Sequence, residues 1–519
     1  MPESDSPVDT TATTVAEIMS TPVVTTGPDA TIATAAEQMR HRKVGSVVIV
    51  DDGRPIGILT ERDLVRIAAA GADASSDPVG EWMTPDPDWV ARGASVSDAF
   101  MSLAEHGYRH IPVVDDKQLV GIVSMRDLMR IAQIQPAENL AHEIPKGLEG
   151  VVVAETVIGD VRGLEGFSHY RQYSAVDLAE RRTLEDVWYL MFDRELPTLA
   201  EREAFIDEIR PLREIPGDVA DALPTLARLG GDAPPLDMLR TTYSLFATSL
   251  AFAPSLDVPA AELRQQALRT CAVIPTLLMA LYRLRNGREP VAPHPDLSYA
   301  ANYLYMLTGE TPPPEHARAV EQYLISTIDH GFNSSTFTAR VITSTGADLG
   351  SAIVGAIGAL SGPLHGGAPG RALDMLDSIG TLDNAEPWLR DAVARGDRLM
   401  GFGHRVYKTD DPRSTMLRGV AERLGGDKVE LAKAIEAKAI EVLTELKPGR
   451  KLYTNVEFYA GIVMDTCGVP REMFTPTFAS SRAIGWCAHV LEQAADNRLI
   501  RPSAQYVGPP PPQPVPDPA

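Results

Sequence analysis

The segment GFGHRVYKTDDPRS, residues 401–414, is the most informative stretch of this 519-residue chain. It places His404 between a glycine and an arginine. Two other segments also set a histidine among small residues, IDHGFNSSTFTAR (328–340) and SGPLHGGAPGRA (361–372). Glycine lets the backbone turn tightly and approach a ligand closely, so each imidazole is expected at a helix end or tight turn, with a ring nitrogen facing a cleft. The three histidines are therefore candidate functional residues.

The sequence around these segments is dominated by long stretches with apolar residues at helical spacing. Examples are RTLEDVWYLMFDREL (182–196), QQALRTCAVIPTLLMALYRLRNG (265–287) and DKVELAKAIEAKAIEVLTELK (427–447). Alternating β-branched patterns are rare in this part of the chain. The pattern predicts a mainly α-helical domain from about residue 140 onward.

Taken together, the motifs DHxFNSSTF, GPLHGGA and GFGHRVYKTDDPR resemble the citrate synthase family and follow its order. The segments GLEGVVVAETVIGDVRG (147–163) and TPTFASSRAIGW (475–486) resemble further blocks of that family. The resemblance implies a citrate synthase domain over residues 146–507, mainly α-helical, with large and small subdomains. It also implies an acyltransferase that condenses acetyl-CoA with oxaloacetate and hydrolyses citryl-CoA to citrate and CoA.

The condensation needs a base for a carbon acid, a stabiliser for the enolate oxygen and a group that polarises the ketone. By resemblance, His365 would donate a hydrogen bond to the thioester carbonyl and His404 would polarise the oxaloacetate ketone. Glu457, in NVEFYAG, stands where the family normally has the aspartate that removes the acetyl proton. The reaction so implied requires no metal and no cofactor.

Oxaloacetate has two carboxylates, and planar, permanently charged guanidinium groups suit them best. The resemblance assigns the oxaloacetate contacts to His330, His404, Arg413, Arg482 and Arg501. Arg501 would come from the partner subunit, so a homodimer or a larger homo-oligomer is expected. The expected contacts for CoA are Arg405, Lys408 and Asn455.

Two other functions stay open at the level of sequence. Glutamate in place of aspartate displaces the carboxylate oxygens by roughly 1 Å, a shift that can cost about 100-fold in rate. A weakly catalytic metabolite sensor is therefore one alternative. The other is a 2-methylcitrate synthase that uses propionyl-CoA, because one methylene changes discrimination by only about 1 to 3 kcal/mol.

The amino-terminal part contains an internal repeat. IGILTERDLVRIA (56–68) matches VGIVSMRDLMRIA (120–132), and IMSTP (18–22) matches WMTPD (82–86), at a spacing of about 64 residues. Each copy has a helical stretch, an apolar strand, an Asp-Asp turn, a second strand and a second helix. The pattern predicts a duplicated β-α-β-β-α unit of the α+β class.

This segment resembles a CBS-domain pair over residues 14–134, with repeats at about 14–72 and 78–134. In that family each repeat contributes a hydroxyl and a carboxylate to an adenine-nucleotide site, for AMP, ADP or ATP. The matching residues are Thr60, Arg62 and Asp63 in the first repeat and Ser124, Arg126 and Asp127 in the second. The same residues also form capping boxes, which need no ligand. Regulation by a nucleotide and assembly of subunits remain alternative roles.

Composition limits the remaining possibilities. With 48 basic and 70 acidic residues, the formal net charge is -22, so nucleic acid and anionic membranes are not expected partners. Three cysteines are too few for a disulfide framework, and the start of the chain lacks the pattern of a secretory signal, so a cytoplasmic location is expected. His106 and His110 have a metal-ligand spacing, but Gly107 intervenes and no metal site is predicted.

Three segments are expected to lie outside the folded domains. Residues 1–13 are rich in Thr, Ser, Pro and Asp and are predicted to be disordered. Residues 135–145 are predicted to link the two domains. Residues 508–519, GPPPPQPVPDPA, are predicted to form an extended, proline-rich tail.

Overall fold

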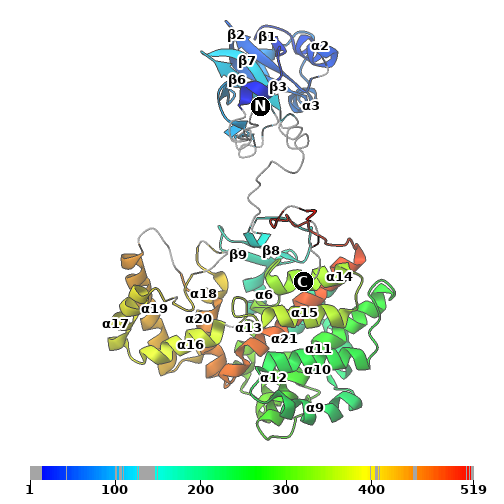
Figure 1. Ribbon diagram of the computed structural model, residues 1–519, viewed down its shortest axis with the longest axis vertical. Coiled ribbons are helices and arrows are strands. Elements are labelled where there is room, and N and C mark those ends of the chain that lie inside the picture. The colour runs from blue at the N-terminus through cyan, green and yellow to red at the C-terminus, as the bar shows by residue number, and fades with distance from the viewer. Residues whose placement is uncertain are drawn as a thin grey trace. The chain divides into compact units, whose positions relative to one another are not determined.

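The computed structural model divides the chain into two compact units, Met1–Val152 and Val153–Ala519 (Figure 1). The described residues are 14–42, 44–96, 98–99, 102–103, 108, 110–124, 127, 146–148, 150–366, 368–397, 399–403, 407, 409–447, 453–509, 511–513 and 515. The predicted disordered start and the predicted linker lie outside them, as does His106.

The first repeat of the amino-terminal unit has the predicted β-α-β-β-α order. Its elements are β1 (Thr25–Thr26), α2 (Ile32–Arg42), β2 (Ser46–Asp51), β3 (Arg54–Thr60) and α3 (Glu61–Ala70). With β4 (Thr84–Pro85) the strands form a sheet in the order β1-β2-β3-β4. Strand β1 pairs parallel with β2, and β2 pairs antiparallel with β3. Helix α2 is the crossover that such a parallel pair requires.

The second repeat has the same strand pairing. Its sheet has the order β5-β6-β7, with β5 (Val90–Ala91), β6 (His110–Asp115) and β7 (Gln118–Ser124). Ser46 pairs with Thr60 in the first hairpin, and His110 pairs with Ser124 in the second. Both hairpins contain one register shift at the equivalent place. The predicted duplication is therefore confirmed down to the register of the strands.

The two repeats exchange their leading segments. Val15, in α1 (Val15–Ile18), is buried in the apolar core of the second repeat, whereas Met83 packs on the core of the first. A Cβ atom added to Gly121 would lie 2.3 Å from Sδ of Met19, and one added to Gly57 would lie 2.0 Å from Sδ of Met83. Strands β3 and β7 thus each have a glycine where a methionine of the other repeat's leading segment crosses the strand.

The second unit begins with a small antiparallel sheet and continues with helices. The sheet has the order β10-β9-β8, with β8 (Gly159–Arg162), β9 (Phe167–Tyr170) and β10 (Tyr173–Ser174). The helices are α6 (Ala175–Arg181), α7 (Leu184–Asp193), α8 (Leu199–Ile209), α9 (Gly217–Gly230), α10 (Pro235–Ser249), α11 (Ala260–Arg285), α12 (Tyr299–Thr308), α13 (Pro314–Ser326), α14 (Ser334–Ser344), α15 (Leu349–Leu360), α16 (Ala368–Ile379), α17 (Leu382–Arg395), α18 (Pro412–Leu424), α19 (Asp427–Leu446), α20 (Val456–Thr466) and α21 (Phe474–Ala495).

Within this unit the helices form a larger and a smaller group. Helices α16 to α20 lie on one side of α13 and α21, and helices α9 to α12 lie on the other (Figure 1). Helix α21 contacts α11 of the larger group and α16 of the smaller group, and it also contacts α14 and α15. The predicted mainly helical domain with two subdomains is confirmed, and α13 and α21 both contact helices of each subdomain.

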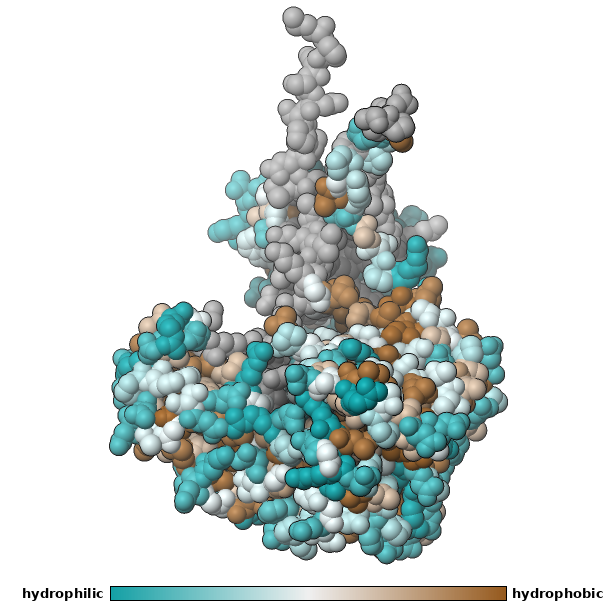
Figure 2. All heavy atoms as spheres, turned by 60° about the horizontal axis from the view of Figure 1, so that its bottom comes forward, coloured by the Kyte–Doolittle hydropathy of each residue, from teal (hydrophilic) through white to brown (hydrophobic). Residues whose placement is uncertain are grey.

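Helix α11 is the one described helix whose length and composition would allow it to cross a membrane. Its apolar window is 78% buried inside the unit, as expected for the core helix of a globular domain. On the face of the second unit shown in Figure 2, hydrophobic side chains occur in several separate groups among hydrophilic ones. Scattered apolar residues are normal on a protein surface and do not by themselves define an interface.

Helix α21 approaches the chain after α13 more closely than a side chain at Gly485 would allow. A Cβ atom at this position would lie 2.1 Å from the carbonyl oxygen of Ile328. Asp329 and His330 follow Ile328 in the chain, so this contact also sets the distance between α21 and the turn that holds His330. Backbone oxygen cannot move aside as a flexible side chain can.

Replacement of Gly485 by alanine should therefore destabilise the fold. We expect Gly485→Ala to lower the free energy of unfolding by about 2 to 3 kcal/mol, because overpacked methyl groups strain a dense core. Thermal or urea unfolding measures the change. Gly419→Ala is the matched control, because its Cβ meets only the far end of Arg423, 3.7 Å away, inside α18. Equal stability of the two variants would contradict the tight contact.

Candidate active site

A cavity of about 150 Å³ in the second unit brings together five residues that the sequence motifs predicted. They come from separate elements: the turn before α14, the turn before α16, and helices α18, α20 and α21. The lining residues are Tyr323, Thr327, His330, Asn333, His365, Gly366, Arg413, Val456, Glu457, Ala460, Phe478 and Arg482. Two guanidinium groups, two imidazoles and one carboxylate thus share a small, partly apolar pocket.

Arg413 is positioned by its own helix cap. Asp411, the N-cap of α18, accepts hydrogen bonds from Nε of Arg413 at 3.0 Å and from its Nη2 at 2.8 Å. The same carboxylate accepts the backbone N–H of Val456 at 3.2 Å, which ties α18 to the start of α20. Burial opposes the charge on Arg413, but Asp411 outweighs burial, so the pKa of Arg413 is raised. Within the described part of the chain, Nη1 of Arg413 has no hydrogen-bond partner, so it can donate to a ligand.

Arg482 has no carboxylate bonded to it among the described residues, and Asp329 acts on its charge only at longer range. Its side chain is 1% exposed, its Nε donates to the carbonyl oxygen of Thr327 at 2.8 Å, and its Cζ lies 4.6 Å from the ring centre of Phe478. Burial lowers its pKa. Within the described part of the chain Arg482 forms no ion pair, although its guanidinium group lines the cavity. A buried cation without an ion pair is costly, and an anionic ligand in the cavity would compensate it.

His365 is held by the first turn of α14. Its Nε2 lies 2.8 Å from Oγ of Ser335 and accepts the backbone N–H of Ser335 at 3.3 Å. Oγ of Ser335 in turn accepts the indole N–H of Trp486 at 3.0 Å. Burial, and next the positive charge of Arg482, lower the pKa of His365 to about 4. A neutral ring that accepts at Nε2 has its proton on Nδ1, so His365 can donate a hydrogen bond from that nitrogen.

Glu457 and Asn455 lie at the start of α20. Asn455 is the N-cap: its Oδ1 accepts the N–H of Glu457 at 3.1 Å, and its Nδ2 donates to the carbonyl oxygen of Gly403 at 2.9 Å. Glu457 lines the cavity, whereas Asn455 does not. Both polar groups of Asn455 are engaged within the protein, so its contact with CoA stays a prediction.

Three predicted residues, His404, Arg405 and Lys408, lie outside the described residues. Their described neighbours lie against elements of the site. The N–H of Gly403 donates to the backbone carbonyl oxygen of Tyr453 at 2.8 Å, and the ring of Tyr407 lies edge-on to His330 with centroids 5.6 Å apart. Arg501 follows α21, is exposed, and does not line the cavity of its own chain. Its role across a dimer stays a prediction.

The predicted nucleotide residues form the capping boxes that the sequence allowed. Oδ2 of Asp63 accepts from Oγ1 of Thr60 at 2.7 Å and from its N–H at 2.9 Å. Oδ2 of Asp127 accepts from Oγ and N–H of Ser124 at 2.6 and 2.9 Å. Arg62 is exposed, and Arg126 lies outside the described residues. The capping geometry is therefore present, and nucleotide binding by the same residues stays a prediction.

A larger cavity of about 650 Å³ lies in the amino-terminal unit, but its lining does not point to catalysis. It is formed by strand β1, helix α2 and their flanks, and it includes neither Thr60 nor Asp63. Among the residues that the structure describes, no three His, Cys, Asp or Glu side chains gather as a metal site would require. The small cavity with convergent charged groups is the better candidate for an active site.

Sequence reasoning missed several residues of the site. Asn333, Ser335 and Asp411 lie inside the quoted motifs, and their proximity to the histidines and Arg413 in sequence was the available indication. Tyr323 and Ala460 lie on helices whose apolar periodicity does not distinguish a cavity wall from the core.

Comparison with known proteins decides the family. The family model for the citrate synthase C-terminal domain matches residues 147–503, and the model for the CBS domain matches residues 15–70 and 79–133. The chain belongs to the citrate synthase family. It is therefore a condensing enzyme of the acyltransferase type, with a CBS pair at its amino-terminal end.

Similar proteins and solved structures point to the same family. The chain is 42% identical to citrate synthase from Haloferax volcanii, over 71% of this chain and 97% of that protein. It is 39% identical to citrate synthase from Deinococcus radiodurans, over 70% of this chain and 96% of that protein. The crystal structure of citrate synthase from Thermotoga maritima is similar with a TM-score of 0.63 at 38% identity, covering 72% of this chain and 98% of that one.

The low pKa of His365 predicts how its ring responds to pH. Because the pKa is depressed from 6.5 to about 4, the ring should stay neutral as the pH falls from 8 to 5.5, while an exposed histidine would become protonated. The ring ¹⁵N shifts of histidine-labelled protein measure this, with His365→Gln to assign the signals. A titration of His365 with a midpoint near 6.5 would contradict the burial and the contact with Ser335.

Proposed function

We propose that the chain is a citrate synthase that condenses acetyl-CoA with oxaloacetate and hydrolyses the resulting citryl-CoA to citrate and CoA. One observation supports this most strongly. Arg413 and Arg482 are both buried and both line a cavity that also holds His365 and Glu457, and Arg482 forms no ion pair within the described residues. Oxaloacetate, a small dicarboxylate with a ketone, suits this arrangement.

The two arginines offer different contacts to a dicarboxylate. Arg413 is fixed by Asp411, which leaves one nitrogen, Nη1, for a carboxylate. Among the described residues, Arg482 donates a hydrogen bond only from Nε, so both of its Nη groups can donate to the second carboxylate. Charge-assisted hydrogen bonds of this kind are roughly twice as strong as neutral ones and are directional. They would hold the ketone of oxaloacetate in one orientation.

The remaining side chains can then perform the bond changes. Glu457 removes a proton from the methyl carbon of acetyl-CoA, while His365 donates a hydrogen bond to the thioester oxygen as negative charge develops there. The enolate carbon attacks the ketone carbon, and the alkoxide is stabilised by the predicted contact from His404. Water then cleaves the thioester and releases CoA, which leaves citrate.

For the amino-terminal unit, we propose that an adenine nucleotide binds at the two repeats and changes the activity of the enzyme. Thr60 with Asp63 and Ser124 with Asp127 occupy equivalent positions at the ends of β3 and β7. A carboxylate in this place can accept from both hydroxyls of a ribose. Allosteric control requires that the nucleotide bind two states of the protein with different affinity.

We also propose that the enzyme is a cytoplasmic homodimer or larger homo-oligomer in which Arg501 reaches the partner's site. The exposed position of Arg501, outside the cavity of its own chain, supports this arrangement. All three cysteines are free and buried, which suits a reducing compartment.

The first test is release of CoA thiol from acetyl-CoA or propionyl-CoA by the purified chain. We expect release that requires oxaloacetate and is faster with acetyl-CoA, and we expect Arg482→Met to lower kcat/KM for oxaloacetate by about 100-fold, because two charge-assisted hydrogen bonds are lost. Arg228→Met, at an exposed position on α9, is the control and should change nothing.

The other outcomes of this assay identify the alternatives. Faster release with propionyl-CoA would instead indicate a 2-methylcitrate synthase. Absence of release from folded protein that still binds oxaloacetate would indicate a metabolite sensor, with Glu457 as an ineffective base. Wild-type activity in Arg482→Met would contradict the assignment of the dicarboxylate site.

Nucleotide binding is tested by calorimetry with AMP, ADP and ATP on the full chain. We expect saturable heat for at least one of them, and a loss of affinity of about tenfold in Asp63→Asn or Asp127→Asn, because an amide cannot accept from both ribose hydroxyls. Asparagine can still accept the backbone N–H in the capping box, so stability should change little. No heat with any nucleotide would leave subunit assembly as the role of the repeats.

A further inference from the structure

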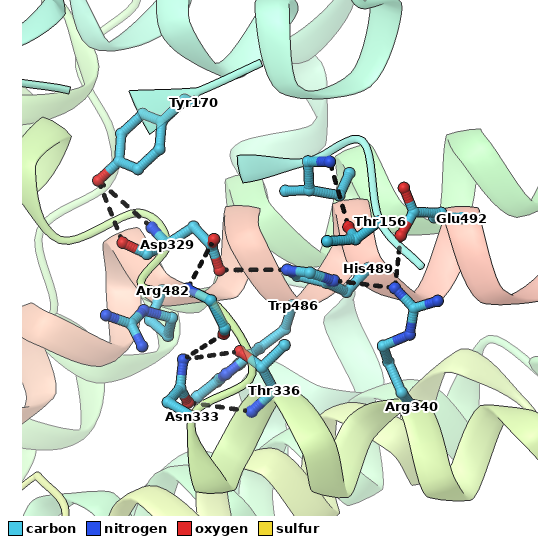
Figure 3. Close-up of polar contacts among 12 residues, drawn as sticks. Thr156, Tyr170, Asp329, Asn333, Thr336, Arg340, Arg482, Trp486, His489 and Glu492 are labelled. Atoms are coloured by element: carbon cyan, nitrogen blue, oxygen red, sulfur yellow. Dashed lines mark hydrogen bonds and ion pairs between the residues drawn. The ribbon is translucent and has the colours of Figure 1, made fainter. Parts of the chain in front are cut away.

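A buried histidine on α21 lies next to the candidate site without lining its cavity. His489 is two helical turns beyond Arg482 and is 0% exposed. Figure 3 shows its ring between the side chains of Asp329 and Arg340, which come from the turn before α14 and from α14 itself. None of the steps described for the condensation uses it. The position of this fully buried imidazole, between the carboxylate of Asp329 and the guanidinium group of Arg340, needs a physical explanation.

The contacts of His489 determine where its proton is. Nη1 of Arg340 lies 3.1 Å from Nδ1 of His489, and Nε2 of His489 lies 3.2 Å from Oδ1 of Asp329. A guanidinium group only donates hydrogen bonds, so Nδ1 must accept and cannot hold a proton. The proton is then on Nε2 and is donated to Asp329. The ring is a neutral bridge that accepts on one side and donates on the other.

On one side of the bridge, Asp329 closes a turn around His330. Its Oδ2 accepts the backbone N–H of Gly331 at 3.1 Å. This hydrogen bond links the residue before His330 to the residue after it. Gly331 has a φ of 59°, a conformation that glycine adopts readily. Tyr170 donates from its hydroxyl to the carbonyl oxygen of Asp329 at 3.3 Å. The orientation of the Asp329 side chain therefore fixes the backbone at His330.

On the other side, Arg340 is held by several partners and can serve as a fixed support. Its Nε donates to Oε1 of Gln493 at 3.0 Å and its Nη1 to Oε2 of Glu492 at 2.5 Å. Oε1 of Glu492 accepts the backbone N–H of Val157 at 2.8 Å, and Cζ of Arg340 lies 5.0 Å from the ring centre of Phe332. Because Arg340 is 3% exposed, it cannot turn to water if His489 is removed.

We propose that His489 is a positioning residue of the enzyme: through Asp329 it holds His330 in place to receive oxaloacetate. This inference rests on the proposed function. A buried bridge between Arg340 and Asp329 needs an acceptor and a donor at a fixed separation, and a neutral imidazole supplies both. Removal of the ring takes away the hydrogen bond that Nε2 donates to the Asp329 carboxylate. The carboxylate can then rotate and lose its hydrogen bond to the backbone N–H of Gly331.

Two substitutions separate positioning from simple packing. Glutamine can accept from Arg340 through its carbonyl and donate to Asp329 through its amide, whereas methionine fills similar volume but does neither. We expect His489→Met to raise KM and Kd for oxaloacetate by about tenfold, with KM for acetyl-CoA changed less than about twofold. We expect His489→Gln to recover most of the lost affinity.

The wild-type protein supplies a further check that does not depend on the folding of a variant. The ring ¹⁵N shifts of His489 should show a protonated Nε2 and an unprotonated Nδ1. A protonated Nδ1 would overturn the bridge. Unchanged oxaloacetate affinity in a folded His489→Met variant would overturn its positioning role. So would a loss of oxaloacetate affinity in His489→Gln that equals the loss in His489→Met. If the wild type binds no oxaloacetate, the proposed function itself fails, and calorimetry on the wild type distinguishes that case.

Discussion

The second unit depends on one electrostatic constraint: two guanidinium groups are kept out of water at the edge of one small cavity. Arg413 is neutralised within the protein by Asp411, whereas no carboxylate of the described residues forms an ion pair with Arg482, which feels Asp329 only at longer range. A fold that only needed stability would gain by replacing Arg482 with an apolar residue, because isolated buried charge is expensive. A buried guanidinium group without an ion pair in the described residues is understandable as a binding site for an anion.

The surrounding structure keeps these charged groups at fixed positions. Asp411 binds Arg413 and also the backbone at the start of α20, so the carboxylate that fixes the cation also fixes the helix that contains Glu457. Helix α21 supplies Arg482 and, through Trp486, a donor to the serine that contacts His365. The absence of a side chain at Gly485 lets this helix approach the turn at His330. The catalytic groups thus come from separate segments but share a few rigid supports.

Sequence motifs predicted the chemical groups better than their mutual arrangement. The histidines and arginines stand in short, contiguous motifs, so His330, His365, Arg413 and Arg482 could be selected from the order of those motifs alone. The pairing of Arg340 with Glu492 joins residues 152 positions apart, and no local pattern reveals such a contact. Tyr323 and Ala460 resemble ordinary core residues because a cavity wall and a core have the same helical periodicity.

The same distinction applies to the amino-terminal unit. The repeat spacing predicted two copies of one fold, and the registers of the two hairpins agree with it. The exchange of leading segments, with Val15 buried in the second repeat, was not predicted, because a short apolar segment does not specify its partner. The glycines at positions 57 and 121 become meaningful only when the crossing methionines are seen.

The central claim is that the cavity is built for a molecule with two carboxylates, and it is tested most directly by comparing two ligands on the wild-type protein. Calorimetric titration with oxaloacetate should give saturable binding at one site per chain. Pyruvate retains the keto acid but lacks the second carboxylate, and it should bind at least about 100-fold more weakly, since one set of charge-assisted hydrogen bonds is lost. Equal affinity for the two ligands, or no binding of oxaloacetate, would contradict the account.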